Sequence, residues 1–219
     1  GGKGIIGMAT KEEDYVEDVI AANSHALLMF FTNTGKVHTR KTYQIPEAGR
    51  TAKGSNIVNI LELEAGEKVT AIISVPGFSD KEYLFMVTRR GIVKKTLLSE
   101  FEYQRKGGKI ALTLDDGDEL VYVKHTSGND DIIIATHDGL SARFGEEDVR
   151  PMGRGARGVK GMTLSDGDYI VGCAVISEDK ALLTITEGGF GKRCEFDNFS
   201  AHNRGVKGVM CHGISERTG

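Results

Sequence analysis

The chain has 219 residues, with 28 basic and 31 acidic side chains and a formal net charge of −3 at pH 7. That balance argues against a nucleic-acid-binding protein, but the basic residues gather around glycine turns, so a nearly neutral chain can still carry one positive rim. No apolar run approaches membrane-spanning length and no signal peptide is present, which indicates a soluble cytoplasmic protein.

Short apolar runs of strand length alternate with turns along the chain, as in an all-β protein. Four of these runs each lead through a turn that ends in glycine, whose positive φ suits a hairpin, into a second strand. The expected hairpins join 26–31 to 36–41, 82–87 to 92–96, 131–135 to 140–144 and 181–185 to 190–194. A further strand pair is expected later in each repeat, with 69–75, 120–124 and 169–175 as its clearest members. Single helical turns are expected at 98–101 and 148–150.

Three anchors recur in fixed order along the chain. The first is Thr-x-x-Gly, at 32–35, 88–91, 136–139 and 186–189. The second is a basic turn, Arg-x-x-Lys-Gly, at 50–54, 157–161 and 204–208, with Lys106-Gly107-Gly108-Lys109 and Gly1-Gly2-Lys3-Gly4 as partial copies. The third is Leu-x-x-Gly-Asp/Glu, ending at Glu67, Asp118 and Asp168. The lysines of the basic turns are 50, 56, 51 and 47 residues apart, which is typical of stacked or radially arranged units.

The period and the strand content together predict four-stranded blades of roughly 50 residues in a propeller-like ring. An open β-solenoid would show the same period, so the repeat alone does not distinguish the two arrangements.

Specific residues carry a family resemblance over essentially the whole chain. Gly1-Gly2-Lys3-Gly4 resembles the end of a family motif, the box Q-[RK]-R-G-G-K-G. Two further segments resemble repeats of the same family: Gly-Arg-Thr-Ala-Lys-Gly at 49–54 and Gly-Val-Lys-Gly-Met-Thr-Leu at 158–164. The chain thus resembles the C-terminal domain of the bacterial DNA gyrase A protein, of the type IIA topoisomerases. The resemblance implies a six-bladed β-pinwheel that wraps DNA around its outer edge and serves ATP-dependent negative supercoiling. It also implies, as partners, double-stranded DNA, the rest of gyrase A, and gyrase B in an A2B2 holoenzyme associated with the nucleoid.

The chain departs from that family at three places. It begins inside the box, and its repeats stop about one blade short of six, so residues 1–219 are expected to be one β-pinwheel domain truncated at both ends. Internally, 104–109 resembles the box, with Lys106 in place of an arginine; we interpret it as a repeat turn, because Ile110 replaces the final glycine.

The residues expected to bind DNA form two groups, because lysine and arginine hold duplex DNA through its phosphates. The basic turns supply Lys3, Arg50, Lys53, Arg105, Lys106, Lys109, Arg154, Arg157, Lys160, Arg204 and Lys207. The strands after the hairpin turns supply Arg40, Lys41, Lys94, Lys95, Arg143, Lys192 and Arg193. The alternative is that these charges are solvated strand edges that block aggregation.

No catalytic residue, cofactor or metal site is expected in this chain. Residues 153–158 spell G-x-G-x-x-G, but no strand and helix flank them as a dinucleotide site requires. The six histidines form no zinc spacing with the three cysteines, which are expected to be reduced. Two further readings stay open: the equivalent domain of topoisomerase IV, and a protein-interaction propeller. The absence of tryptophan disfavours a WD-repeat propeller.

Overall fold

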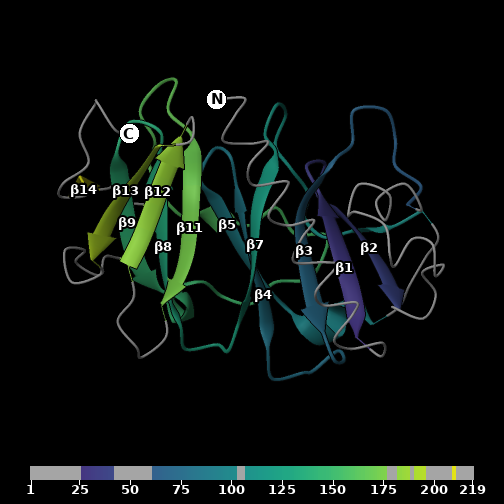
Figure 1. Cartoon of the computed structure of the whole chain (residues 1–219). Helices are drawn as coiled ribbons and strands as arrows, with labels where there is room; N and C mark the ends of the chain where they lie inside the picture. Colours follow the sequence, from purple (N-terminus) through teal and green to yellow (C-terminus); the bar gives the residue numbers. More distant parts are fainter. Residues whose placement is uncertain are drawn as a thin grey trace.

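The computed structural model describes residues 26–41, 61–102 and 107–176, and the backbone of strands at 182–187, 190–195 and 209–210. These described residues contain strands and two short 3-10 turns, η2 (Leu98–Phe101) and η3 (Glu146–Asp148), and no α-helix. The strands form three four-stranded antiparallel sheets and one separate hairpin (Figure 1). The all-β prediction is therefore confirmed. Across the described ranges, no helix is long and apolar enough to cross a membrane.

Each four-stranded sheet is one blade with the same strand order. The first blade is β3 (Val69–Val75), β1 (Leu27–Thr32), β2 (Lys36–Lys41) and β6 (Lys109–Ile110). The second is β7 (Leu120–Thr126), β4 (Tyr83–Thr88), β5 (Ile92–Leu97) and β10 (Val159–Lys160). The third is β11 (Ile170–Ile176), β8 (Asp131–Thr136), β9 (Leu140–Gly145) and β14 (Val209–Met210), and the separate hairpin is β12 (Leu182–Glu187) with β13 (Phe190–Glu195). The strands expected from the sequence are confirmed, with ends shifted by one or two residues.

The fourth strand of each blade comes from a later repeat, which the sequence pattern did not predict. The short strand β10 follows the third hairpin in the chain, yet it pairs with β5 of the second blade, with Lys160 opposite Ile92. In the same way β6 pairs with β2 of the first blade, with Ile110 opposite Lys36. The blades are therefore joined by exchanged edge strands as well as by packing.

This pairing corrects one alignment of the repeats. The N–H of Gly161 donates to the carbonyl of Gly91 at 2.8 Å, and the N–H of Ala111 donates to Gly35 at 2.7 Å. Ala111 is thus the structural equivalent of Gly161, and Ile110 stands where Lys160 stands one blade later. The repeat pattern predicts Lys109 at that position, and this prediction is wrong by one residue. Accordingly Ile110 is 52% exposed, whereas Lys109 is buried.

The hydrophobic core lies between blades, so both faces of each central strand are apolar. In β4, Leu84 and Met86 face the first blade, where they join a cluster with Met29 and Phe31. Their neighbours Phe85 and Val87 face the third blade and join a second cluster. Because successive side chains of a strand point to opposite faces, burial on both faces requires an unbroken apolar run. This explains why the sequences of the central strands are continuous apolar segments.

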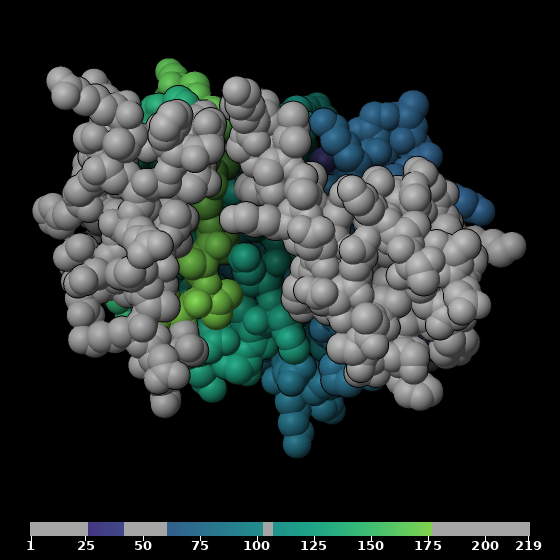
Figure 2. Space-filling model, in the orientation of Figure 1, coloured from purple at the N-terminus to yellow at the C-terminus, as the bar shows by residue number. Residues whose placement is uncertain are grey.

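The inner strands of the three blades follow one another around the centre. Contacts run from β3 to β7 and from β7 to β11, and these strands stand side by side in Figure 1. On the face shown in Figure 2, the green segment that contains β11 lies beside the teal segment that contains β7. Backbone bonds tie the blades at this level: Leu120 N–H donates to Asn33 at 3.0 Å, and Ile170 N–H donates to Arg89 at 2.9 Å.

Candidate nucleic-acid interface

The Thr-x-x-Gly anchor closes the hairpin turn at the end of each blade. In the three described copies the glycine N–H donates to the threonine carbonyl, at 3.0 to 3.1 Å. The Thr88 hydroxyl also accepts the N–H of Ile92 at 3.1 Å. Gly91 has a φ of +89°, and a Cβ there would lie 3.0 Å from the carbonyl oxygen of Met162. The anchor therefore sets both the turn and the approach of the next repeat, which places β10 beside it.

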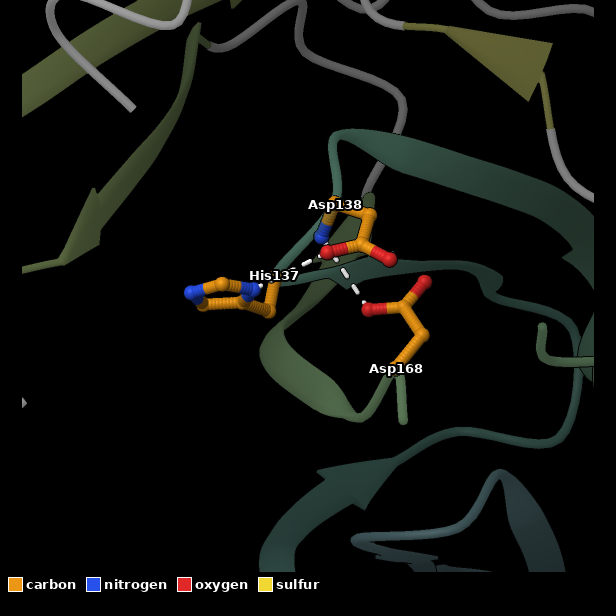
Figure 3. Close-up of side chains that lie close together, drawn as sticks. All are labelled: His137, Asp138 and Asp168. Atoms are coloured by element: carbon orange, nitrogen blue, oxygen red, sulfur yellow. Dashed lines mark hydrogen bonds and ion pairs between the residues drawn. The ribbon is translucent and has the colours of Figure 1, made fainter. Parts of the chain in front are cut away.

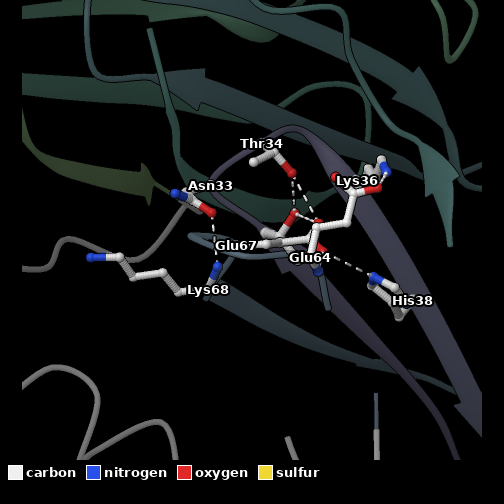
Figure 4. Close-up of polar contacts among 8 residues, drawn as sticks. Asn33, Thr34, Lys36, His38, Glu64, Glu67 and Lys68 are labelled. Carbon is white, nitrogen blue, oxygen red and sulfur yellow. Dashed lines mark hydrogen bonds and ion pairs between the residues drawn. The ribbon is translucent and has the colours of Figure 1, made fainter. Parts of the chain in front are cut away.

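The acidic residue of the third anchor is buried against the same hairpin turn. Asp118 Oδ1 accepts the N–H groups of Arg90 and Glu119, at 3.0 and 2.8 Å. In the first blade, Glu67 accepts the hydroxyls of Thr32 and Thr34 at 2.8 and 2.9 Å (Figure 4). Two anchors that lie about 30 residues apart in sequence thus meet, and together they hold the turn residues at the end of the blade.

The turn of the second blade carries two exposed arginines that lie outside both groups predicted from the sequence. Arg89 and Arg90 line a hollow of about 500 Å³ together with Lys160 of the exchanged strand β10. The guanidinium of Arg89 lies 3.9 Å from the ring centroid of Tyr169, which also lines the hollow. Three cations from two repeats therefore gather at one end of the second blade. The signal that could have found them is Arg-Arg within the Thr-x-x-Gly anchor itself.

The basic turn at 153–161 places its cations differently. Lys160 is exposed on the edge strand. Arg157 is also exposed but forms a two-point ion pair with Asp115, at 2.5 and 2.6 Å, which lowers the pKa of that carboxyl. Arg154 is half-buried, and its guanidinium donates to the carbonyl of Ile110 at 3.4 Å. Of this turn, Lys160 is the cation best placed to meet a phosphate.

Two lysines of the second group lie inside the protein. Lys94 is 0% exposed, and its ammonium donates to the carbonyls of Ala111 and Arg154, at 2.6 and 2.5 Å. Burial lowers the pKa of Lys94 to about 8, with the charge of Arg154 as a smaller cause. Lys95 is 4% exposed and donates to the carbonyl of Glu146 at 3.0 Å. Both ammonium groups hold neighbouring segments in place, so we leave these two lysines out of the proposed interface.

The remaining expected residues divide by whether the structure describes them. Arg143 is half-buried and donates to Asp131 at 2.8 and 3.0 Å, and Arg40 is half-buried and donates to the carbonyl of Thr39 at 2.9 Å. Lys41 is also half-buried, at the end of β2. Lys192 and Arg193 belong to β13, of which only the backbone is described. Outside the described residues lie Lys3, Arg50, Lys53, Arg105, Lys106, Arg204 and Lys207.

Comparison with known protein families matches nearly the whole chain. A family model described as DNA gyrase C-terminal domain, beta-propeller, matches residues 1–23, 26–76, 82–127, 130–177 and 180–216. The DNA gyrase A protein of Clostridium acetobutylicum is 52% identical over 161 residues, which is 74% of this chain and 19% of the relative. That of Salmonella typhimurium is 45% identical over 162 residues, or 74% of this chain and 18% of the relative. The chain thus spans about a fifth of the length of these relatives.

Solved structures show the same fold. The C-terminal domain of a DNA topoisomerase IV has a TM-score of 0.77 at 32% identity, covering 86% of this chain and 59% of that one. A DNA gyrase A C-terminal domain has a TM-score of 0.73 at 26% identity, covering 90% and 64%. The E. coli ParC C-terminal domain, at 18% identity and a TM-score of 0.69 over 88% of this chain and 79% of that one, supports the fold alone.

Proposed function

This chain belongs to the family of DNA gyrase C-terminal domains, and from that premise we propose that it binds duplex DNA without sequence preference and bends it around its blades. The observation that carries the proposal is the gathering of Arg89, Arg90 and Lys160 at one hollow. Phosphate contacts by lysine and arginine supply affinity for any DNA sequence through the release of counterions. The same three positions hold Asn33, Thr34 and Ile110 in the first blade, so further contacts along a curved duplex are assigned to the basic turns of the other repeats.

Bending requires contacts along an arc, which the repeat provides. Smooth bending of a 20–30 base-pair duplex costs roughly 1–6 kcal/mol, and contacts spread along the arc must offset that cost. The edge strands β6 and β10 occupy the same place on successive blades. The basic turns of the other repeats, which include Lys53 and Lys207 outside the described residues, are proposed to continue the rim.

The salt dependence of DNA affinity tests the interface. We expect Arg89→Ala with Arg90→Ala to weaken binding of a random duplex. The slope of log affinity against log salt should also flatten, by about 1 for each phosphate that the variant no longer binds. The joint replacement of Lys53, Lys160 and Lys207 by alanine is expected to do the same. Binding is measured by fluorescence anisotropy at several salt concentrations.

A matched control removes an exposed charge elsewhere on the second blade. Lys81 is exposed and precedes β4, at the opposite end of that strand from Arg89 and Arg90. Lys81→Ala is expected to leave the slope unchanged. If the slope of log affinity against log salt were unchanged in both multiple variants, the proposed DNA interface would be wrong and a protein-interaction propeller would be supported.

Bending is measured separately from binding, by energy transfer between dyes at the two ends of a duplex of about 40 base pairs. A rise in transfer that added salt reverses would support wrapping by this chain. Binding without a rise would limit the proposal to DNA binding.

The roles of the whole protein are proposed by family membership. We propose that the chain itself is not catalytic, that the rest of gyrase A together with gyrase B completes an A2B2 topoisomerase in the bacterial cytoplasm, and that bending serves ATP-dependent negative supercoiling.

The topoisomerase IV domain remains a second candidate because of its structural similarity, with a TM-score of 0.77 at 32% identity. A complete gyrase A protein that carries this domain should supercoil relaxed plasmid when it is assembled with gyrase B and supplied with ATP. Failure to do so would support the second candidate.

A further inference from the structure

The hairpin turn of the third blade brings three metal-ligand side chains together. His137 and Asp138 lie in the turn between β8 and β9, and Asp168 lies just before β11 (Figure 3). One imidazole nitrogen and one oxygen from each carboxylate all lie within 4.8 Å of one another. His137 Nδ1 is 3.0 Å from Asp138 Oδ1. The pairing of the two anchors therefore assembles the cluster, although 30 residues separate Asp138 from Asp168.

Asp168 has a buried oxygen without a donor. The residue is 8% exposed, and its Oδ1 accepts the N–H groups of Asp138 and Tyr169, at 3.0 and 2.9 Å. Its Oδ2 is buried and has no hydrogen-bond partner among the residues that the structure describes. Figure 3 shows the carboxylates of Asp138 and Asp168 turned toward each other. Two facing carboxylates repel, and a buried oxygen without a donor is costly, so this arrangement calls for a positive partner.

The first two blades differ from the third at this position. In the first blade both oxygens of Glu67 have donors: the hydroxyls of Thr32 and Thr34 on Oε2, and the N–H of Glu64 on Oε1 at 3.0 Å. In the second blade the residue at the place of Asp138 is Arg90, a cation. The third blade thus has a carboxylate where its neighbours have a hydroxyl donor or a positive charge.

We propose that His137, Asp138 and Asp168 bind a divalent transition-metal ion of the Zn²⁺ type. Zinc is bound by imidazole nitrogen and carboxylate oxygen at about 2.0–2.2 Å, and an imidazole ligand favours such ions over Mg²⁺ or Ca²⁺. The His137 imidazole stacks on the ring of Tyr169, with centroids 4.8 Å apart, and the Asp138 side chain is exposed at the open side of the cluster. The bound ion fastens the hairpin turn to the start of β11, with water at the open positions. The proposal does not depend on DNA binding.

Zinc binding to the complete chain tests this site. Calorimetric titration with Zn²⁺ alone counts the ions bound, and thermal unfolding with and without Zn²⁺ measures the gain in stability, which follows from binding to the folded state only. We expect Asp138→Asn and His137→Gln each to bind one Zn²⁺ fewer than the unaltered chain. Their melting temperatures should also respond less to Zn²⁺. Both side chains are exposed, so these variants keep the buried bonds of Asp168 Oδ1.

The control uses another exposed histidine that faces a carboxylate. His125 Nε2 lies 2.6 Å from Glu82 and belongs to no described cluster of three ligands. His125→Gln should bind as many zinc ions as the unaltered chain. Equal zinc stoichiometry in Asp138→Asn, His137→Gln and the unaltered chain would overturn the site. An equal rise in melting temperature with Mg²⁺ at the same concentration would overturn its assignment to a transition metal.

Discussion

At the scale of single residues, equivalent positions in successive blades hold different side chains with different consequences. The third residue after the hairpin glycine is His38, Lys94 or Ala142, and all three are buried. Burial lowers the pKa of His38, against a smaller opposing effect of Glu67, just as it lowers that of Lys94. Equivalent positions of the blades therefore share their burial but not their residue type. A basic residue in the repeat does not by itself identify a surface charge.

The buried ammonium of Lys94 predicts a pH dependence of stability. The folded chain releases this proton near pH 8, whereas the unfolded chain holds it until about 10.5. The unfolded state thus binds more protons between these values, and stability should rise with pH across that window. Relative to Lys94→Met, the free energy of unfolding should increase by about 3 kcal/mol, at about 1.4 kcal/mol per pK unit. Urea unfolding of both proteins at several pH values measures the difference. Parallel pH profiles would contradict this prediction.

At the scale of elements, the exchanged edge strand is the feature that joins the basic turn to a blade. Gly158 opens that strand with a φ of +95°, and a Cβ there would lie 2.5 Å from the carbonyl oxygen of Val93. Gly161 follows it, and a Cβ there would lie 2.4 Å from Val93 Cγ1. These two glycines of the basic turn are required for the close approach of the strand to β5, independently of any contact with phosphate.

We therefore expect Gly158→Ala to destabilise the protein by about 1–3 kcal/mol, through backbone strain and the close contact. Gly155→Ala is the matched control, because Gly155 has no positive φ and a Cβ there would meet nothing within 4 Å. Urea unfolding compares the two variants. If the folded Gly158→Ala protein kept its stability but lost DNA affinity, the glycine would instead serve approach to phosphate.

At the scale of the whole molecule, the core is shared between blades and not enclosed within them. Phe85 of the second blade and Phe144 of the third pack with ring centroids 6.0 Å apart. Phe31 and Phe101 form an edge-to-face pair at 6.1 Å between the first and second blades. Each blade therefore buries its apolar faces only in the presence of its neighbours, so the blades should lose structure together.

Phe85→Ala should lower the free energy of unfolding by about 3–5 kcal/mol, as expected for a large buried aromatic side chain. Because the packing crosses the blade interface, hydrogen exchange measured by mass spectrometry should accelerate in β8 as well as in β4. Ile110→Ala serves as the control at an exposed apolar position, and it should change stability little. Acceleration confined to β4 would contradict a shared core.

The strands, the turns and the repeat were predictable from the sequence, because short continuous apolar runs and glycines with positive φ act locally. The anchors Thr88 to Gly91 and Asp118 could be recognised as a pattern for the same reason. The contact between these two anchors could not be predicted, since it depends on hydrogen bonds between segments about 30 residues apart. Tertiary structure alone decided that β10 joins the preceding blade, that Lys94 is buried while Arg89 and Arg90 are exposed, and that His137, Asp138 and Asp168 converge. Each of these depends on which distant backbone a strand pairs with, and no local preference specifies that partner.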